Sequence, residues 1–323
     1  MLALFIGRVF CILDWLCNKN KKTEPTPNYE KTEPVQNLTK FTNIKGGTML
    51  EIKTTKLGAE LTSIKLDGKE KLHQGEMYWK RHAPILFPIV GQIKEGKTII
   101  DDRTFKMGQH GFARDMEFEE IESNKFLLRA SKETLEKFPY KFELYVQYFI
   151  QDNELTVQYQ VINKDNKQML FGIGGHPAFI CDYSTGNYQI QFNKEETEVE
   201  FMQLESGLIS NQKAQNIMKD NSIYLTENIF KNDAIIMKNL KSNQVTLYNK
   251  KTNKKVLDFD FTGFPYLALW SKIGAPFVCI EPWFITADKV DSSGIFKEKE
   301  NILKLEPEKK FECRYKIKFY EGE

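Results

Sequence analysis

The chain has 323 residues, enough to bury a large hydrophobic core, and its 46 basic and 44 acidic residues give a formal net charge of only +2. This mixed, nearly balanced charge excludes a strongly basic surface, so we expect no nucleic-acid partner. The five cysteines are odd in number and widely spread, with neither a CxxC pair nor a Cys/His cluster. They predict neither a zinc site nor a disulfide framework, and they favour a reducing, cytoplasmic compartment.

Residues 1–47 differ in composition from the rest of the chain. Met1–Cys17 is apolar but carries two charges, so it is too short and too charged to predict a membrane span with certainty. Thr23–Lys45 is polar, contains several Pro, Thr and Glu residues, and is typical of a flexible linker. We therefore divide the chain into an apolar segment with a linker, residues 1–47, and one domain, residues 48–323. A weak signal-anchor, which would tether the protein to a membrane, an uncleaved targeting segment and translation from Met49 are three alternative explanations.

Alternating apolar and polar residues dominate the chain after residue 48. Phe142–Ile150 and Leu155–Val161 alternate on either side of a short polar turn, which predicts a β-hairpin with one buried face. Val245–Tyr248 and Val256–Phe261 predict a second hairpin. The best helical segment, Lys132–Phe138, is short and is followed by a proline. With no βαβ rhythm and no internal repeat, the sequence predicts an all-β fold, a large antiparallel β-sandwich.

The segment Phe171–Phe179, which reads FGIGGHPAF, presents one of only four histidines in the chain. Pro177 biases the backbone of His176 toward an extended conformation. The two glycines before it, Gly174 and Gly175, permit either a sharp turn or the close approach of another group. His176 titrates near neutrality when unperturbed, so it is a candidate general acid or base. The alternative is a histidine whose nitrogens only bond the backbone.

A second candidate lies in Phe277–Trp283, a continuous apolar run that predicts a buried strand ending at Glu281. Pro282 again fixes an extended residue before it. A carboxylate at the mouth of a buried strand is partly desolvated, which raises its pKa and makes it a better base near neutrality. Trp283 could stack on a sugar ring. Alone, Glu281 would more simply pair with a surface lysine; with His176 it forms a complementary acid/base pair.

His110 precedes a glycine in the loop segment Gln109–Asp115. Read alone, it is as compatible with a structural role as with a functional one. Arg114 and Asp115 in the same segment favour a local ion pair over a substrate contact.

Together these segments resemble the aldose 1-epimerase (galactose mutarotase-like) superfamily, and most closely its LacX-like branch, from about Met49 to the C-terminus. Each motif is weak alone, but they occur in the order of the family and are specific jointly. The matching stretches are Arg81–Gly91, Gln109–Arg114, Gly174–Phe179, Phe230–Asp233, Gly263–Tyr266 and Cys279–Trp283.

The resemblance implies a β-sandwich with an open sugar-binding cleft and with no metal and no organic cofactor. It implies that His176 is the general acid on the ring oxygen and that Glu281 is the general base on the anomeric hydroxyl. His110 would hydrogen-bond near the ring oxygen, and Asp233 is a plausible partner for sugar hydroxyls.

Two positions depart from the pattern of the family. Gln92 stands where the family usually has an arginine that contacts sugar hydroxyls; glutamine can still hydrogen-bond but lacks the charge and the bidentate fork. Ile285–Thr286 replaces the usual Gly-Ile pair, and because isoleucine tolerates positive φ poorly, the loop behind the base is expected to run differently.

We therefore expect an enzyme, a carbohydrate epimerase that interconverts the α and β anomers of a free aldose and takes a small-molecule sugar as its partner. One alternative is a hexose-6-phosphate 1-epimerase, for which Arg81 and the neighbouring Lys80 would supply positive charge. Another is a non-catalytic carbohydrate-binding protein on the same scaffold, favoured by Gln92. A glycosidase is less consistent, because no two carboxylates occur in comparable settings. Sugar identity and oligomeric state stay open.

Overall fold

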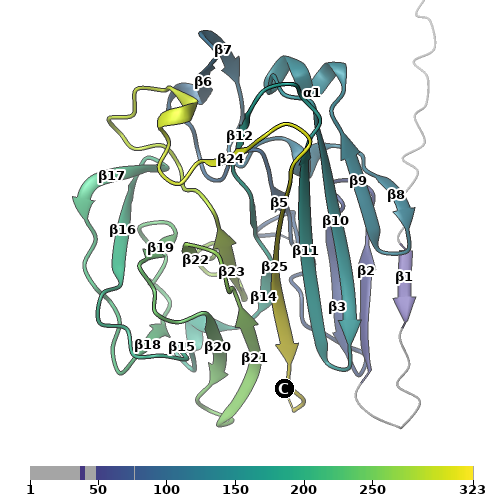
Figure 1. Cartoon of the computed structure of the whole chain (residues 1–323). Helices are drawn as coiled ribbons and strands as arrows, with labels where there is room; N and C mark the ends of the chain where they lie inside the picture. Colours follow the sequence, from purple (N-terminus) through teal and green to yellow (C-terminus); the bar gives the residue numbers. More distant parts are fainter. Residues whose placement is uncertain (1–36, 41–48, 76, 323) are drawn as a thin grey trace, which may run out of the picture. The chain divides into compact units, whose positions relative to one another are not determined.

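The structure is a computed structural model in which residues 37–40, 49–75 and 77–322 are described. These residues form 25 strands and a single α-helix, and every pairing between named strands is antiparallel (Figure 1). The predicted all-β class is confirmed. The apolar segment Met1–Cys17 lies outside the described residues, as does most of the linker.

One large sheet has nine strands, and the C-terminal strand runs through its centre (Figure 1). In sheet order the strands are β18 (Ser222–Leu225), β15 (Tyr188–Phe192), β20 (Gln244–Asn249), β21 (Lys254–Asp260), β25 (Lys310–Phe319), β11 (Glu154–Asn163), β10 (Phe142–Gln151), β9 (Lys125–Arg129) and β8 (Glu119–Glu122).

The other large sheet has eight strands, and it carries both segments that the sequence analysis singled out for His176 and Glu281. In sheet order the strands are β17 (Leu208–Lys213), β16 (Glu200–Glu205), β19 (Ile235–Lys238), β22 (Tyr266–Trp270), β23 (Phe277–Trp283), β13 (Gly174–Gly175) and β5 (Ile85–Leu86), with β14 (Ala178–Ile180) also paired to β23.

Three small sheets and a few short helical turns complete the described residues. The small sheets are β1 (Asn37–Lys40) with β2 (Leu50–Thr54), β3 (Leu61–Leu66) and β4 (Lys69–Glu70); β6 (Lys97–Ile100) with β7 (Arg103–Lys106); and β12 (Met169–Phe171) with β24 (Leu303–Leu305). The helical elements are α1 (Lys132–Lys137) and the 3₁₀ turns η1 (Lys94–Gly96), η2 (Ala113–Asp115), η3 (Tyr183–Thr185) and η4 (Phe296–Glu298).

Strand β1 corrects one detail of the predicted linker. The sequence analysis placed Asn37–Lys40 in a flexible stretch, but these residues pair with Glu51–Thr54 of β2. The polar composition of the stretch does not prevent pairing, because backbone hydrogen bonds at a sheet edge do not depend on apolar side chains.

The two predicted hairpins and the predicted helix are confirmed. In β10 and β11 buried and partly buried residues alternate, as expected for strands with one face on the core. Strands β20 and β21 form the second hairpin. Ser131 caps the N-terminus of helix α1. Its side chain accepts from the Thr134 amide while the Thr134 hydroxyl accepts from the Ser131 amide, a capping box that stabilises so short a helix.

The hydrophobic core lies between the two large sheets. Phe179 of β14 contacts Phe259 of β21 and Phe319 of β25, with ring centroids 6.1 and 6.3 Å apart. At Gly175 the two sheets approach so closely that an added Cβ would lie 2.9 Å from a ring carbon of Tyr315. Of the two roles the sequence left open for this glycine, the structure shows close approach, because its φ is not positive. The backbone that leads to His176 is thus packed against a rigid aromatic layer.

Within the described residues, no helix has both the length and the apolarity required to cross a membrane.

Candidate functional site

Strand register brings His176 and Glu281 together. Gly174, two residues before His176, pairs with Trp283, and Ala178, two residues after it, pairs with Cys279. Both pairs belong to one antiparallel register, so His176 falls opposite Glu281. Pro177, which follows His176, has no amide proton to donate to the ladder. Its carbonyl accepts from the Ile280 amide at 3.3 Å.

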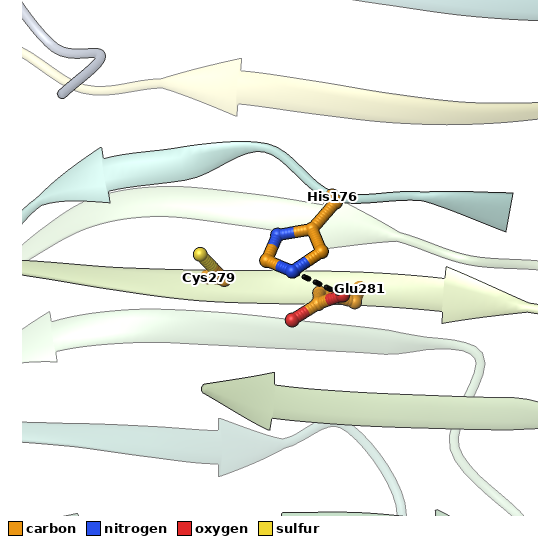
Figure 2. Close-up of side chains that lie close together, drawn as sticks. All are labelled: His176, Cys279 and Glu281. Carbon is orange, nitrogen blue, oxygen red and sulfur yellow. Dashed lines mark ion pairs between the residues drawn. The ribbon is translucent and has the colours of Figure 1, made fainter. Parts of the chain in front are cut away.

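The two side chains are in contact and almost fully buried. Nε2 of His176 lies 3.2 Å from Oε2 of Glu281, and the side chains are 8% and 1% exposed (Figure 2). The indole N–H of Trp283 donates to the same Oε2 at 3.2 Å. The prediction that the strand ends at Glu281 is wrong, since β23 continues to Trp283 with all seven residues buried. Glu281 is therefore more deeply desolvated than a carboxylate at a strand end.

Burial opposes charge on both groups. Desolvation lowers the pKa of His176 to about 3, and the positive charge of Arg114 acts in the same direction. Desolvation also raises the pKa of Glu281 well above its ordinary value, with a further contribution from Asp233, while the Trp283 hydrogen bond opposes the rise. The favoured resting state is thus a neutral imidazole beside a protonated carboxyl. Moving one proton across the contact turns this state into an ion pair.

Two tryptophans enclose His176. The Trp79 indole stacks on the imidazole, with centroids 4.8 Å apart and an interplanar angle of 28°, and Trp270 meets the imidazole edge-on at 5.6 Å. The buried His73 fixes the Trp79 segment, because its Nε2 lies 2.9 Å from the Trp79 carbonyl oxygen. An aromatic face over the ring desolvates the neutral imidazole and can stabilise an imidazolium by a cation–π interaction.

His110 is a further ring in contact with His176, and it lies in the loop between β7 and η2. The ring centroids are 5.5 Å apart and the rings meet edge-on. The loop is tied to Gly91 twice: the His110 amide donates to the Gly91 carbonyl at 2.8 Å, and the Gly91 amide donates to Nδ1 of His110 at 3.1 Å. Burial, together with the charges of His176 and Arg114, lowers the pKa of His110 well below its ordinary value.

These groups face a cavity of about 640 Å³, a size typical of small-molecule sites. Five of the six residues that the sequence analysis selected line it, namely His176, Glu281, His110, Asp233 and Arg81. Positive charge gathers at the wall, because Arg114 and Lys272 join Arg81 there. Arg81 donates to Asp115 at 2.6 Å, and Arg114 donates to the Gln109 carbonyl at 2.7 Å.

Gln92 is the sixth selected residue, and it is not among the residues that line the cavity. Its side chain lies against the turn between β16 and β17, where a Cβ on Gly207 would collide with the Gln92 Oε1. Its backbone carbonyl accepts from the Asp288 amide at 2.8 Å. Gly207 itself lines the cavity, and a sugar contact through Gln92 stays a prediction.

The loop after β23 accommodates Ile285 without positive φ. The isoleucine is fully buried and packs against Gly172, where a Cβ would collide with the isoleucine side chain. The glycine that the family pattern has in this loop is thus not required here, because Gly172 provides the space.

The sequence analysis missed Trp79, Trp270 and Arg114 as wall residues. Trp79 lies in a loop between β4 and β5, where no periodicity marks a functional side chain. Arg114 was expected to pair locally with Asp115, and Nε does lie 3.9 Å from Asp115, but the guanidinium also lines the cavity. Trp270 sits at the end of β22, adjacent in register to Cys279. Its place in the cavity wall depends on that pairing, which the sequence does not show.

Replacing Trp79 with leucine is expected to raise the pKa of His176 from about 3 toward the 6.5 of a free imidazole, because water then reaches the face of the ring. Trp79→Phe, which keeps an aromatic face, is the matched control and should raise it much less. An NMR titration of the His176 ring nitrogens measures the change. Equal pKa values in the wild type and the leucine variant would show that Trp79 does not desolvate the imidazole.

Most of the chain is similar in sequence to known proteins of one family. A family model described as aldose 1-epimerase matches residues 41–301. The chromosomal LacX protein of Lactococcus lactis subsp. lactis is 36% identical over 277 residues, which cover 80% of this chain and 92% of that protein. The plasmid form is 35% identical with the same coverage.

Two solved structures share the fold closely. A galactose mutarotase related enzyme from Lactobacillus acidophilus superposes with a TM-score of 0.80 at 30% identity, covering 88% of this chain and 97% of that one. A galactose mutarotase-like protein from Lactobacillus casei ATCC 334 gives a TM-score of 0.79 at 27% identity, covering 88% and 100%. The predicted mutarotase-like sandwich is confirmed.

Proposed function

Since the chain belongs to the aldose 1-epimerase family, we propose that this carbohydrate epimerase interconverts the α and β anomers of a free aldose by opening and closing the sugar ring. The observation that carries the proposal is the buried contact of 3.2 Å between His176 and Glu281 at the wall of a cavity of sugar size. The anomeric hydroxyl and the ring oxygen are bonded to the same carbon. An acid and a base that act on both atoms must therefore lie within a few ångströms of each other.

In this mechanism the ion-pair form of the couple receives the closed ring. The Glu281 carboxylate takes the proton of the anomeric hydroxyl while the His176 imidazolium protonates the ring oxygen, and the bond between that oxygen and C1 breaks. The products are an open-chain aldehyde, a neutral imidazole and a protonated carboxyl. Rotation about the C1–C2 bond exposes the other carbonyl face, and the reverse transfers close the ring as the other anomer.

The environment suits the open-chain stage. Desolvation favours the neutral forms of both groups, which are the forms that accompany the aldehyde. The contact between the two groups allows a proton to pass from the resting Glu281 carboxyl to His176, which forms the ion pair that receives a closed ring. His110 lies beside His176 and would hydrogen-bond the same ring oxygen, and Asp233 would bond sugar hydroxyls at the mouth of the cavity.

A second candidate is epimerisation of a hexose 6-phosphate. The observation that favours it is the positive wall formed by Arg81, Arg114 and Lys272. Arg81 is already paired with Asp115, so a phosphate would have to compete with that carboxylate or join it.

The test is anomer exchange measured by NMR magnetisation transfer between the α and β signals of glucose, galactose and their 6-phosphates. With enzyme, exchange of a free sugar is expected to exceed the buffer rate in proportion to enzyme concentration. Acceleration of the phosphates alone would establish the second candidate. Sugar binding without any acceleration would identify a non-catalytic carbohydrate-binding protein and refute the proposal.

A further inference from the structure

A thiol joins the acid/base pair. Cys279 precedes Glu281 by two residues on β23, so both side chains project from the same face of the strand toward His176 (Figure 2). One ligand atom from each of the three residues, a ring nitrogen, Sγ and a carboxylate oxygen, lies within 4.8 Å of the others. Nitrogen, sulfur and oxygen are the donors that Zn²⁺ takes in proteins.

The spacing is close to that of a coordinated metal. Bonds of about 2.0–2.3 Å at tetrahedral angles separate two ligand atoms by roughly 3.3–3.6 Å. The His176 Nε2 to Glu281 Oε2 distance is 3.2 Å, so this pair could share a cation with little movement. The widest separation in the trio, up to 4.8 Å, has to shorten by about 1 Å, which rotation about the Cys279 χ1 and Glu281 torsions can supply.

Two buried polar atoms of the trio have no hydrogen-bond partner in the described residues. They are Oε1 of Glu281, in a side chain 1% exposed, and Nδ1 of His176, in a side chain 8% exposed. Buried polar atoms are rarely left unsatisfied, so each such atom requires an explanation. A cation held by the Glu281 carboxylate and Nε2 of His176 would satisfy Oε1 of Glu281, while Nδ1 of His176 would not bind it. The thiolate and the carboxylate would also neutralise both of its charges.

We propose that His176, Cys279 and Glu281 bind a thiophilic divalent cation such as Zn²⁺, and that the bound ion inhibits the enzyme reversibly by occupying the acid and the base. His176 and Glu281 line the cavity whereas Cys279 does not, so the fourth position of a tetrahedral ion faces the cavity and takes a water molecule. On binding, the metal–sulfur bond replaces the S–H bond of Cys279, and that proton and the Glu281 proton leave to solvent. The binding claim stands on the geometry; the inhibition rests on the proposed function.

The surrounding charges set the expected selectivity. Arg81 and Arg114 at the wall oppose any cation, so a hard ion held by the single carboxylate has too little attraction to remain. A metal that forms a strong bond to the thiolate overcomes this repulsion. The site is therefore expected to take Zn²⁺, Cd²⁺ and Co²⁺ and to ignore Mg²⁺ and Ca²⁺.

The experiment titrates the full chain with Co²⁺, following the thiolate-to-cobalt charge-transfer band, and then displaces Co²⁺ with Zn²⁺. Wild type should give the band with one equivalent bound. Cys279→Ala should lose the band and weaken Zn²⁺ binding at least about 10- to 100-fold, the loss that removal of even an outer-shell partner causes. Cys313→Ala, which removes a cysteine from β25, is the matched control and should keep both. Cys279→Ser replaces the alanine variant if circular dichroism shows that the latter does not fold.

Inhibition is measured in the same samples. Zn²⁺ should slow anomer exchange by wild type and by Cys313→Ala, and exchange should recover when a chelator is added. Whatever the exchange rate of Cys279→Ala without metal, half inhibition of that rate should require at least about 10-fold more Zn²⁺ than in wild type. No thiolate band in wild type, or an equal band in Cys279→Ala, overturns the binding site. A band without inhibition overturns only the regulatory part, and a band in a protein without exchange activity refutes the proposed function but leaves the metal site.

Discussion

Glu281→Gln is expected to lower kcat/KM for anomer exchange by about 10²- to 10⁴-fold, the usual contribution of one positioned acid or base. Glutamine has nearly the same shape and its amide oxygen can still accept from the Trp283 indole, so the loss isolates proton transfer from packing. His176→Asn should cost a similar factor. The double variant should be little worse than either single one, because groups that act as a unit are not additive. Retention of full activity by either single variant would contradict the assigned roles.

The same glutamine substitution is expected to stabilise the fold at neutral pH, by an amount on the order of 1 kcal/mol. Folding raises the pKa of Glu281 well above 4.5, so the folded state binds more protons than the unfolded state above that pH. The stability this gives is fully present below pH 4.5 and is lost as the pH rises. His176 acts in the opposite sense, since its pKa falls to about 3 on folding and stability is lost as the pH drops below 6.5.

Thermal unfolding of wild type and Glu281→Gln between pH 4 and 8 separates the two contributions, because His176 is present in both proteins. The difference in Tm should be small at pH 4 and should grow, in favour of the variant, at higher pH. A difference in Tm that does not change with pH would show that folding does not raise the pKa of Glu281.

Asp288→Ala is expected to destabilise the protein by about 3–5 kcal/mol, the usual cost of leaving one member of a buried ion pair without its partner. Asp288 Oδ1 and Lys299 Nζ are 2.5 Å apart, and the side chains are only 3% and 5% exposed. Burial lowers the pKa of Lys299, and the Asp288 charge opposes that decrease. Without Asp288, the ammonium would have to lose its proton or take in water.

The substitution also removes one side-chain bond from a junction next to the cavity, while the backbone bonds of residue 288 remain. Asp288 accepts from the Lys94 amide through Oδ2 and donates its own amide to Gln92, while its carbonyl accepts from Ile209 in the β16–β17 hairpin. Ala287, beside it, lies where a Cβ on Gly91 would stand, and Gly91 holds His110. A loss of kcat larger than the change in KM is therefore expected at temperatures where the variant is still folded.

Urea unfolding measures the loss of stability in Asp288→Ala, and two further variants control for the change in charge. Asp288→Asn keeps an acceptor for the Lys94 amide but removes the charge, and combining it with Lys299→Met removes the buried cation as well. The double variant should recover part of the loss, because no ion is then left unpaired. A loss below about 1 kcal/mol in Asp288→Ala would mean that Lys299 is already solvated in the native state.

The sequence predicts the strands well because alternation is a local property. In β10 and β11 it identifies which side chains are buried without knowledge of any partner strand. It also selects His176 and Glu281, since each precedes a proline in a largely apolar segment. Their contact could not be predicted from spacing, because it depends on the register of β13 and β14 against β23. The same pairing brings Cys279, which shares a strand with Glu281, close to His176.

Other features depend on packing that no local pattern encodes. The strand of Glu281 was expected to end where the apolar run meets the charged residue, yet β23 keeps its register with β22 through Pro282. Trp79 reaches His176 from a loop, and the Asp288–Lys299 pair joins two ends of another loop. Such contacts depend on how loops pack against the assembled sheets, which no local sequence pattern specifies.

The hydrogen bond from the Gly91 amide to His110 fixes the tautomer of that imidazole. An amide can only donate, so Nδ1 must be the bare nitrogen and the proton of the neutral ring must be on Nε2. Since burial holds the pKa of His110 well below its ordinary value, the ring is neutral and this assignment holds at neutral pH. The ring can then offer a hydrogen but cannot take one, so it recognises a lone pair. An oxygen that binds beside His110 must therefore accept a hydrogen bond from Nε2–H. His110 does not compete with His176 and Glu281 for the proton that they transfer.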